Sequence, residues 1–585
     1  MKKTIIITCL IQIASFIGLQ NIKAQEIEPT WESINQRGYP EWFKDAKLGI
    51  FIHWGLYSVP AWAGPEGYGE WYYKGLMSGD SGRIAVMQNY GGDYASLRNY
   101  WHATNWNPND WAKLFKQSGA KYVLLVTKHH DGYCLWDYEN TALKDWNSVI
   151  SGPRRNIVSE LTEAVRNVGL QMGFYYSLTE WSNPIHTWTV HPNDSIGKYV
   201  DQYMIPQFKD LITKYRPTVL FTDGEWDNTA EQFKARELIS WYYNTVGPEA
   251  IVNNRWGAGH QHGYKTPEYS GGIIDTNTPW AECRGIGRSF GVNHNERLEN
   301  FLSSKELISH FVQLVAAGGG LTLNVGPEAD GTIPFIQQER LVDLGKWLEI
   351  NGEAIYGSRS WKKAYDTHPY TYERTDSTLK FNWVRNSPAK GITVDSFNVV
   401  WKFTLTPQQT NQYTFTMHAD DNATLLFEGK PLLTATKDTV TYKLHLAAGK
   451  KYNFEIQYRE NDLEARMQLF WESNSMEKQP VVSDNGFKAT YTCNKPYVCY
   501  TTQGEILYAI ATEWPSKSTE YNLIIPYDHE PSSRTRITLL GCDQKLDWEY
   551  NKKKKQIIIN TSNIDYQDIS KYPAGGWTFK IEFLK

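Results

Sequence analysis

Two patterns of apolar positions divide the chain near residue 360. From about residue 45 to 360, short apolar runs alternate with segments whose apolar residues recur at helical spacing. This alternation is typical of parallel β-strands joined by α-helices. We therefore expect a (β/α)8-like barrel within residues 25–364. The apolar runs are 48–54, 122–127, 172–178, 219–223, 250–254 and 321–325.

Beyond about residue 365, apolar and polar residues alternate in short segments bounded by turn residues. Helical periodicity is almost absent there, which indicates β-sandwiches. We expect one sandwich over 375–475 and a second over 487–585. Residues 472–486 are rich in Ser, Asn, Pro and Glu and read as a linker between them. The sequence thus predicts a multidomain α/β plus all-β protein.

The first 24 residues have the pattern of a secretory leader. Lys2 and Lys3 precede an apolar stretch at 4–19, and a polar segment ends at Ala24. We expect cleavage near Ala24 and export to the periplasm, the cell surface or the medium. No later apolar run is long enough to span a bilayer.

Composition narrows the functional classes. The formal net charge of −4 provides no attraction for nucleic acid. Aromatic residues make up 14% of the chain, which suits sugar stacking but also protein interfaces and β-domain cores. The cysteines outside the leader are scattered, so neither a disulfide framework nor a zinc pattern follows. Cys493 and Cys499 form the nearest pair, although small buried thiols are the favoured interpretation.

Polar residues follow most of the apolar runs. In a (β/α) barrel the carboxyl ends of the strands converge on one face, so residues distant in sequence meet in one pocket. The residues placed in this way are His53, His129, His130, Tyr176, Asp223 and Arg255.

Two carboxylates are candidates for acid/base and nucleophilic chemistry. Asp223 directly follows an apolar run and precedes Gly224, which predicts a carboxylate at the barrel mouth, although a turn aspartate is the alternative. Glu268 follows in a loop and could be the proton donor. The alternative is that it is a solvated acid without a catalytic role. Retaining glycoside hydrolysis needs two carboxyl groups roughly 5 to 5.5 Å apart, and this pair could supply them.

Other residues suit sugar binding. His129 and His130 are neighbours on a strand and point to opposite faces, so they do not chelate one metal easily. They could donate to sugar hydroxyls, or be one core and one surface histidine. Glu70 could accept from hydroxyls while Trp71 covers an apolar sugar face. The alternative for that pair is an aromatic core with a capping glutamate.

Ten ordered motifs over residues 40–361 resemble glycoside hydrolase family 29, the α-L-fucosidases. They are FIHWG, EWY, KHHDG, YYS, TDGEWD, NRWG, KTPEY, RGIGRSFG, LNVGP and GEAIYG. The resemblance implies an exo-acting retaining enzyme that removes terminal α-L-fucose from oligosaccharides or glycoconjugates, with no cofactor. Asp223 would be the nucleophile and Glu268 the acid/base.

The same resemblance implies a set of fucose-binding residues: His53, Glu70, Trp71, His129, His130, Tyr176 and Arg255, with Phe51 and Phe290 near the methyl group. One departure concerns the acid/base. Relatives often have Trp-Glu before the RGIG motif, whereas this chain has Trp280-Ala281-Glu282. Glu282 is therefore an alternative acid/base, and a non-catalytic fucose-binding surface protein is the competing hypothesis.

The segment 375–475 resembles the protective-antigen-like β-sandwich of adhesins and glycosidases, and glycan contact by this insert is a further expectation. Its Asp420-Asp421 pair stands where some relatives hold a structural calcium ion, with a simple turn as the alternative. Residues 487–585 resemble the terminal β-sandwich of the α-L-fucosidases.

Overall fold

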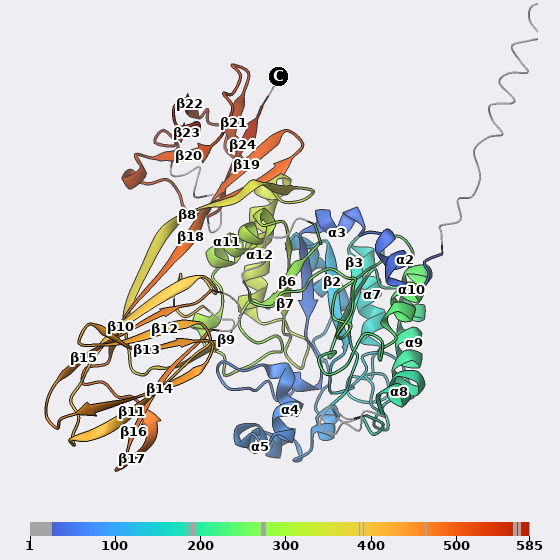
Figure 1. Ribbon diagram of the computed structural model, residues 1–585. Helices are drawn as coiled ribbons and strands as arrows, with labels where there is room; N and C mark the ends of the chain where they lie inside the picture. Colours follow the sequence, from blue (N-terminus) through green and yellow to red (C-terminus); the bar gives the residue numbers. More distant parts are fainter. Residues whose placement is uncertain are drawn as a thin grey trace, which may run out of the picture.

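The computed structural model describes residues 26–181, 183–186, 195–270, 277–384, 387–389, 391–461, 465–565, 570 and 575–583. The expected leader, residues 1–24, lies outside them. One α/β domain stands beside two β-domains (Figure 1). Among the described helices, none has the length and apolar character needed to cross a membrane.

The α/β domain is built on a seven-stranded parallel sheet with the strand order β5-β4-β3-β2-β1-β7-β6. The strands are β1 (Leu48–Ile52), β2 (Tyr122–Lys128), β3 (Gln171–Ser177), β4 (Val219–Asp223), β5 (Ile251–Val252), β6 (Ala281–Gly285) and β7 (Gly320–Val325). All their ladders are parallel, as crossover helices require.

An irregular segment, 264–268, lies between the two edge strands. The Tyr264 amide donates to the Val252 carbonyl on one side, and the Ala281 amide donates to the Lys265 carbonyl on the other. Further parallel bridges join Lys265 to Trp280 and Glu268 to Cys283. The segment therefore closes the sheet, and the expected (β/α)8-like barrel is confirmed.

Helices cover the outside of the barrel. Several of them begin at residues that favour a helix start. The side chain of Asn107 caps one helix, whose first residue is Pro108, and Ser303 with Glu306 forms a capping box at the start of another. The long helices are α6 (Pro108–Gln117), α7 (Ile157–Asn167), α9 (Ile205–Tyr215), α10 (Ala235–Val246), α11 (Ser304–Ala316) and α12 (Phe335–Asn351). Shorter ones are α2 (Trp31–Gln36), α3 (Glu41–Ala46), α4 (Tyr72–Met77), α5 (Ser81–Met87) and α8 (Ser195–Tyr199).

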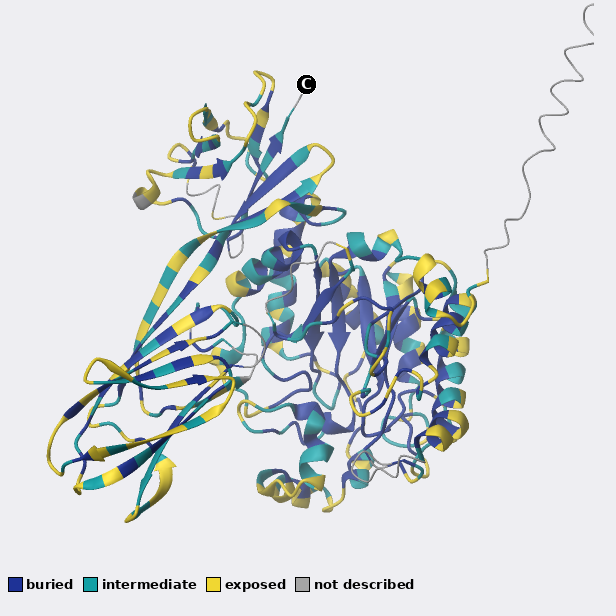
Figure 2. Cartoon of the chain, viewed as in Figure 1, coloured by how far each residue is buried: buried dark blue, intermediate teal, exposed yellow. Residues whose placement is uncertain are grey.

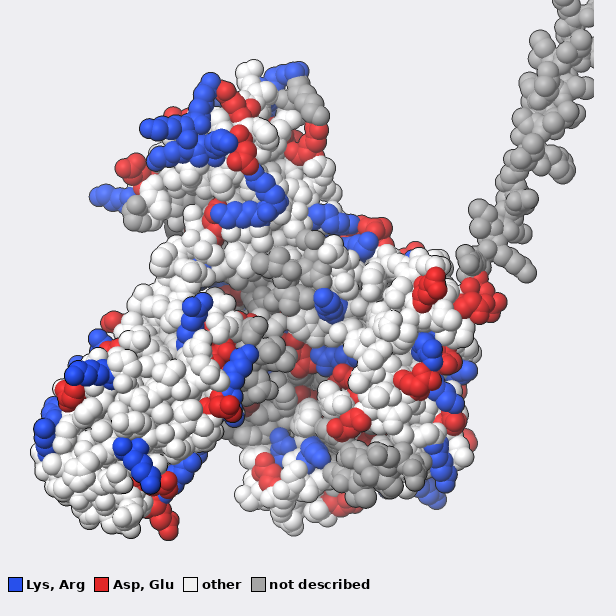
Figure 3. Space-filling model, in the orientation of Figure 1, with Lys and Arg blue, Asp and Glu red and all other residues white. Residues whose placement is uncertain are grey.

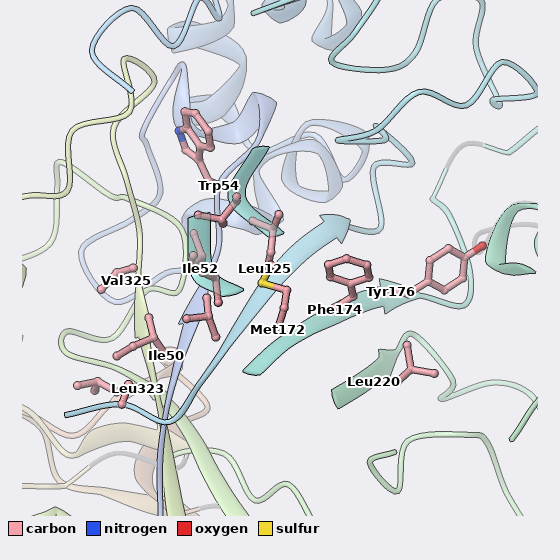
Figure 4. Close-up of a cluster of buried hydrophobic side chains, with 14 of the residues drawn as sticks. Ile50, Ile52, Trp54, Leu125, Met172, Phe174, Tyr176, Leu220, Leu323 and Val325 are labelled. Carbon is pink, nitrogen blue, oxygen red and sulfur yellow. The ribbon is translucent and has the colours of Figure 1, made fainter. Parts of the chain in front are cut away.

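The barrel strands bury both of their faces in separate cores. Side chains such as Phe51, Leu124 and Tyr175 fill the interior, together with Phe43 from α3. Their chain neighbours point the other way and pack against the helices, because successive residues of a strand face opposite sides. Figure 4 shows part of this outer core, including Ile50, Leu125, Phe174 and Tyr176.

Two long antiparallel strands, β8 (Arg359–Asp376) and β18 (Phe487–Gln503), run through both β-domains (Figure 1). The inserted domain is formed by the chain between these two strands. It contains β9 (Lys380–Val384), β10 (Phe397–Leu405), β11 (Asn411–Ala419), β12 (Asn422–Phe427), β13 (Lys430–Thr436), β14 (Thr439–Leu446), β15 (Tyr452–Arg459), β16 (Ala465–Ser473) and β17 (Met476–Pro480).

The terminal domain adds β19 (Ile506–Ala511), β20 (Asn522–Pro526), β21 (Arg536–Leu539), β22 (Asp547–Asn551), β23 (Gln556–Asn560) and β24 (Trp577–Glu582). On the face shown in Figure 3, acidic and basic side chains are interspersed over the inserted domain and the barrel, and basic side chains gather on the terminal domain. The five cysteines from Cys134 onward are free thiols, so the Cys493–Cys499 bridge does not form.

The linker expected at 472–486 is wrong in part. Strand β17 lies inside it and pairs with β16. Val481 is buried in the core of the inserted domain, as is Phe487 at the start of β18. The segment looked like a linker because its exposed strand residues are polar, whereas its few buried ones are too sparse to show a pattern.

Candidate active site

Asp223 is the last residue of β4 and stands at the carboxyl end of the barrel. Its Oδ1 accepts a hydrogen bond from Arg255 Nη1 at 3.0 Å, and its Oδ2 accepts from the Tyr175 hydroxyl at 3.0 Å. His130 Nε2 lies 3.6 Å from Oδ2. A cation and two polar side chains thus fix the direction of this carboxylate.

Burial by itself would raise the pKa of Asp223, but the positive charge of Arg255 and the hydrogen bond and charge of His130 outweigh it. The net effect holds the pKa of Asp223 well below its usual range. The group is therefore an unprotonated carboxylate at neutral pH, as a nucleophile must be.

Glu268 lies on the closing segment 264–268, and its Oε1 accepts a hydrogen bond from Arg255 Nη2. Arg255 Nε also donates to Thr266 Oγ1 at 2.9 Å, which anchors the guanidinium. One arginine therefore bridges the two candidate carboxylates. The Glu268 side chain is 28% exposed against 13% for Asp223, so Glu268 is the carboxylate nearer to the solvent.

A third carboxyl group, Glu225, lies two residues after Asp223. Its Oε2 is buried and has no hydrogen-bond partner among the described residues. Burial, reinforced by the charge of Asp223, raises the pKa of Glu225 to about 7. Glu225 therefore keeps a proton over part of the neutral range, so that the cluster does not carry three full negative charges.

His53 is held by Asn324 at the end of β7. His53 Nδ1 lies 2.6 Å from Asn324 Oδ1, and Asn324 Nδ2 donates to the Phe290 carbonyl at 2.7 Å. Because the amide nitrogen of Asn324 is committed to Phe290, its oxygen faces His53, and Nδ1 of the imidazole must be the donor. Burial lowers the pKa of His53 to about 4 despite this bond. The ring is therefore neutral, with Nε2 as an acceptor.

The two adjacent histidines have different partners. His130 Nδ1 lies 2.6 Å from Ser177 Oγ, whereas the His129 ring stacks on Tyr175 with 5.7 Å between centroids. Burial and the neighbouring imidazoles hold the pKa of His129 well below its usual range. Among the described residues, no group of three or more His, Cys, Asp or Glu side chains is arranged to hold a metal ion.

Most of the other predicted residues surround this cluster. Glu70 is buried, and its Oε2 accepts from the Gly291 amide at 2.7 Å. Burial, opposed by that hydrogen bond, raises the pKa of Glu70 to about 7. Trp71 lies 6.1 Å from His130 between ring centroids. Phe51 and Phe290 both pack on His53, at 4.6 and 4.9 Å between centroids.

Two predicted residues lie outside this cluster. Tyr176 belongs to the outer core (Figure 4), and its hydroxyl donates to Gln207 Oε1 at 2.8 Å. Tyr175 occupies the inward position instead, so the assignment of Tyr176 is corrected to its neighbour. Glu282 is fully buried on the outer face of β6, where its Oε1 lies 2.7 Å from His310 Nε2 on α11. Its neighbours Ala281 and Cys283 face the barrel interior.

Three residues of this cluster, Tyr175, Asn324 and Glu225, are not among the site residues predicted from the sequence. Each lies in a motif already named: YYS holds Tyr175, LNVGP holds Asn324, and TDGEWD holds Glu225. The available signal was their place at strand ends, but which neighbour points inward depends on strand register.

The acidic pair of the inserted domain links the turn between β11 and β12 to strand β15 and the residues after it. Asp420 Oδ1 accepts from the Tyr458 hydroxyl at 2.8 Å and from the Asp421 amide at 3.0 Å. Asp421 Oδ2 accepts from the Asn461 amide at 2.8 Å. Asp420 Oδ2, in contrast, is buried and has no hydrogen-bond partner among the described residues.

An ionised carboxylate and a second carboxylate lie at the mouth of a (β/α)8-like barrel, beside histidine and aromatic side chains, and one arginine contacts both. This arrangement is typical of glycoside hydrolases. The α-L-fucosidase family matches residues 16–353, the PA14 domain residues 351–485, and the α-L-fucosidase C-terminal domain residues 492–582. The chain therefore belongs to the α-L-fucosidase family, glycoside hydrolase family 29, and is an α-L-fucosidase glycoside hydrolase.

Individual relatives agree. The chain is 37% identical over 401 residues to an α-L-fucosidase of Dictyostelium discoideum, across 64% of this chain and 84% of the relative. It is 38% identical over 349 residues to human tissue α-L-fucosidase, across 58% of this chain and 73% of the relative. The crystal structure of Thermotoga maritima α-fucosidase has a TM-score of 0.62 at 28% identity, covering 95% of this chain and 99% of that one. The competing hypothesis of a non-catalytic protein is not supported.

Proposed function

We propose that this enzyme hydrolyses terminal α-L-fucosides with retention of configuration, using Asp223 as nucleophile and Glu268 as general acid and base. The observation that carries the proposal is the bridging of both carboxylates by Arg255. Because one cation pairs with both carboxylates in the free enzyme, both lie at the same site, and a double displacement needs two carboxyl groups there.

In the first step, an Asp223 oxygen attacks the anomeric carbon and forms an ester bond while the bond to the leaving oxygen breaks. The proton of Glu268 goes to that oxygen. In the second step, Glu268 takes a proton from water, the resulting hydroxide attacks the anomeric carbon, and the ester bond to Asp223 breaks. Both carboxyl groups return to their first state, so the cycle needs neither metal nor cofactor.

Glu268 must give a proton to the leaving oxygen, whereas in the free enzyme its Oε1 accepts a hydrogen bond from Arg255. We therefore infer that the Arg255–Glu268 pair opens as the substrate binds. The partial exposure of Glu268 leaves room for this movement, whereas the more buried Asp223 retains Arg255.

The residues beside Asp223 suit a sugar that carries hydroxyls and an apolar methyl group. His53 Nε2 accepts a hydrogen bond from a sugar hydroxyl, since its other nitrogen is committed to Asn324. The adjoining Phe51 and Phe290 rings provide an apolar surface for the fucose methyl group. Fucosylated oligosaccharides and glycoconjugates are the proposed substrates. Export to the periplasm or cell surface is supported by the leader pattern of residues 1–24.

A test is hydrolysis of an aryl α-L-fucoside followed by proton NMR before the sugar anomers equilibrate. Retention gives α-L-fucose as the first product. The β-anomer as first product would overturn the two-step mechanism, and absence of turnover with intact binding would overturn catalysis itself.

A further inference from the structure

A cavity of about 170 Å³ lies at the opposite end of the barrel from Asp223. Its walls include Tyr122 at the start of β2, Trp280 just before β6 and Gly319 just before β7. Asp223, in contrast, ends β4. The cavity therefore opens at the amino-terminal end of the strands, beneath α3, and is separate from the fucose pocket.

Its size limits what it can hold. Sites for drug-sized ligands measure about 300 to 1,000 Å³, whereas one water needs about 10 to 15 Å³ on this kind of measure. A disaccharide is too large for 170 Å³. A small ion with a few waters fits.

Among the described residues, the charges around the cavity leave one cation without an ion-pair partner. Lys44 Nζ pairs with Glu41 at 2.6 Å, and Arg359 pairs with Glu41 at 3.0 Å and with Asp45 at 2.8 Å. Lys47 also lines the cavity and is only 6% exposed. Its ammonium has no ion pair or hydrogen bond among the described residues. A buried ammonium is unfavourable without a counter-charge.

The backbone holds Lys47 in an uncommon conformation. Its φ is 59° and its ψ is −34°, outside the regions that residues with a Cβ normally adopt. The Leu321 amide donates to its carbonyl at 2.7 Å, which fixes this geometry at the edge of the sheet. Such strain persists where the surroundings enforce it and is frequent at binding sites.

The opposite wall is rigid and partly polar. A Cβ added to Gly319 would come within 2.4 Å of the Trp280 ring, so glycine is needed for this close packing. Asn277 and Thr278 add an amide and a hydroxyl group to the lining. The site thus combines one buried cation, two polar side chains and a fixed aromatic wall.

We propose that this cavity binds a small tetrahedral oxyanion of the sulfate or phosphate type, with the Lys47 ammonium as its charged contact. Burial, reinforced by the charge of Arg359 and opposed by Asp45, lowers the pKa of Lys47 to about 8, and a bound anion would raise it again. The site is independent of the fucosidase reaction, because it lies at the other end of the barrel.

The test uses the whole enzyme. Crystals soaked in selenate, a sulfate analogue, are measured at the selenium edge, and calorimetric titrations compare sulfate, phosphate, acetate and chloride at one ionic strength. We expect an anomalous peak within hydrogen-bonding distance of Lys47 Nζ and saturable binding of sulfate or phosphate but not of chloride. If acetate bound and neither sulfate nor phosphate did, the site would be a carboxylate site and the proposed class of ligand, a tetrahedral oxyanion, would be wrong.

Lys47→Met should abolish the peak and reduce affinity at least tenfold, while its kcat/KM on aryl fucoside stays unchanged and its melting temperature in anion-free buffer does not fall. Lys44→Met is the matched control, because it removes a lining lysine that already has a partner, and it should keep the peak. Equal binding by wild type and Lys47→Met, or a peak in crystals without binding in solution, would overturn the proposal.

Discussion

The strands of the barrel and those of the inserted domain bury their residues in different ways. β1 and β2 are buried at every position, whereas β10 alternates between covered and open positions along its length. Figure 2 shows uniform burial in the barrel sheet and alternating burial in the β-domains. Because the barrel strands have cores on both faces, their hydrophobicity does not tell which residue points inward.

The same difference separates the chemistry of the two regions. In the barrel, the side chains of Asp223, Tyr175 and His130 point inward near strand ends. Their polar atoms lie 3.0 to 3.6 Å apart. In the inserted domain, the acids Asp420 and Asp421 accept hydrogen bonds from Tyr458 and from backbone amides on or beside β15 and β16. Substitutions of inward-facing barrel residues should therefore reduce catalysis, whereas substitutions on the outer face of the barrel or in the inserted domain should not.

The largest effect is expected at the inward-facing nucleophile. Asp223→Gly should lose about 10⁴-fold or more in kcat/KM, since catalysis by groups that act as a unit collapses when one is removed. Azide with an activated α-fucoside should restore turnover and give the inverted β-fucosyl azide, identified by NMR. Asp421→Ala, in the inserted domain, is the control and should keep its kcat/KM. An α-fucosyl azide from Asp223→Gly would contradict the assignment.

The second effect compares an inward with an outward glutamate. Glu268→Ala should lose about 10² to 10⁴-fold on natural fucosides, the usual contribution of a general acid. It should lose much less on nitrophenyl fucoside, whose leaving group needs no proton, and azide should give the α-fucosyl azide.

Glu282→Gln is the control for this experiment, because Glu282 faces α11 and contacts His310. We expect a change in melting temperature without any change in leaving-group dependence. If the glutamine variant showed the leaving-group signature and Glu268→Ala did not, the acid/base would be Glu282.

The third effect compares two adjacent tyrosines. Tyr175→Phe removes a hydrogen bond to a charged group, which is worth about 1.5 to 3 kcal/mol, or roughly 10- to 100-fold in kcat/KM. Loss of a donor to the ionised form raises the pKa of Asp223, so the acid limb of the pH–rate profile should move to higher pH. Tyr176→Phe should leave the profile unchanged and cost about 1 kcal/mol of stability. The reverse result would mean that the two tyrosines face the opposite way.

These pairs show how far the sequence could be interpreted. Periodicity predicted the barrel and the β-domains, and strand ends predicted Asp223, Arg255 and both histidines. Tyr176 was predicted in place of Tyr175 because two adjacent tyrosines near the end of one strand carry no sequence signal that tells which of them points inward. The sequence also does not tell that Glu282 points away from the barrel interior, because its contact with His310 depends on the register of β6.

A fourth, smaller effect concerns Asn324. Asn324→Leu removes the acceptor that fixes the His53 tautomer, and we expect roughly a tenfold loss in kcat/KM, mostly through KM, as one hydrogen bond to the sugar weakens. Nitrogen-15 NMR of labelled histidine should show mixed tautomers for His53. Asn324→Asp keeps an acceptor and adds a negative charge, so it should raise the pKa of His53 above about 4. An unchanged NMR signal in both variants would exclude a role for Asn324 in orienting His53.

The smallest effect on chemistry is expected from removal of the inserted domain, and the structure shows where to cut. Pro369 and Asn494 are opposite each other in the β8–β18 ladder. On the side of the terminal domain, His368 and Lys495 both contact Glu513 and would be kept. A two-residue Asn-Gly turn joining His368 to Lys495 should close the ribbon as a hairpin.

The truncated enzyme should keep its kcat/KM on aryl fucoside within about twofold, because every residue of the pocket comes from the barrel and only changes above about 0.4 kcal/mol would exceed that range. Circular dichroism and gel filtration establish that it is folded. Turnover of large fucosylated glycans should fall relative to the aryl substrate if the domain contacts them. A folded truncation that has lost aryl-fucoside cleavage would show that the inserted domain shapes the pocket, and the separation of chemistry between the two regions would be wrong.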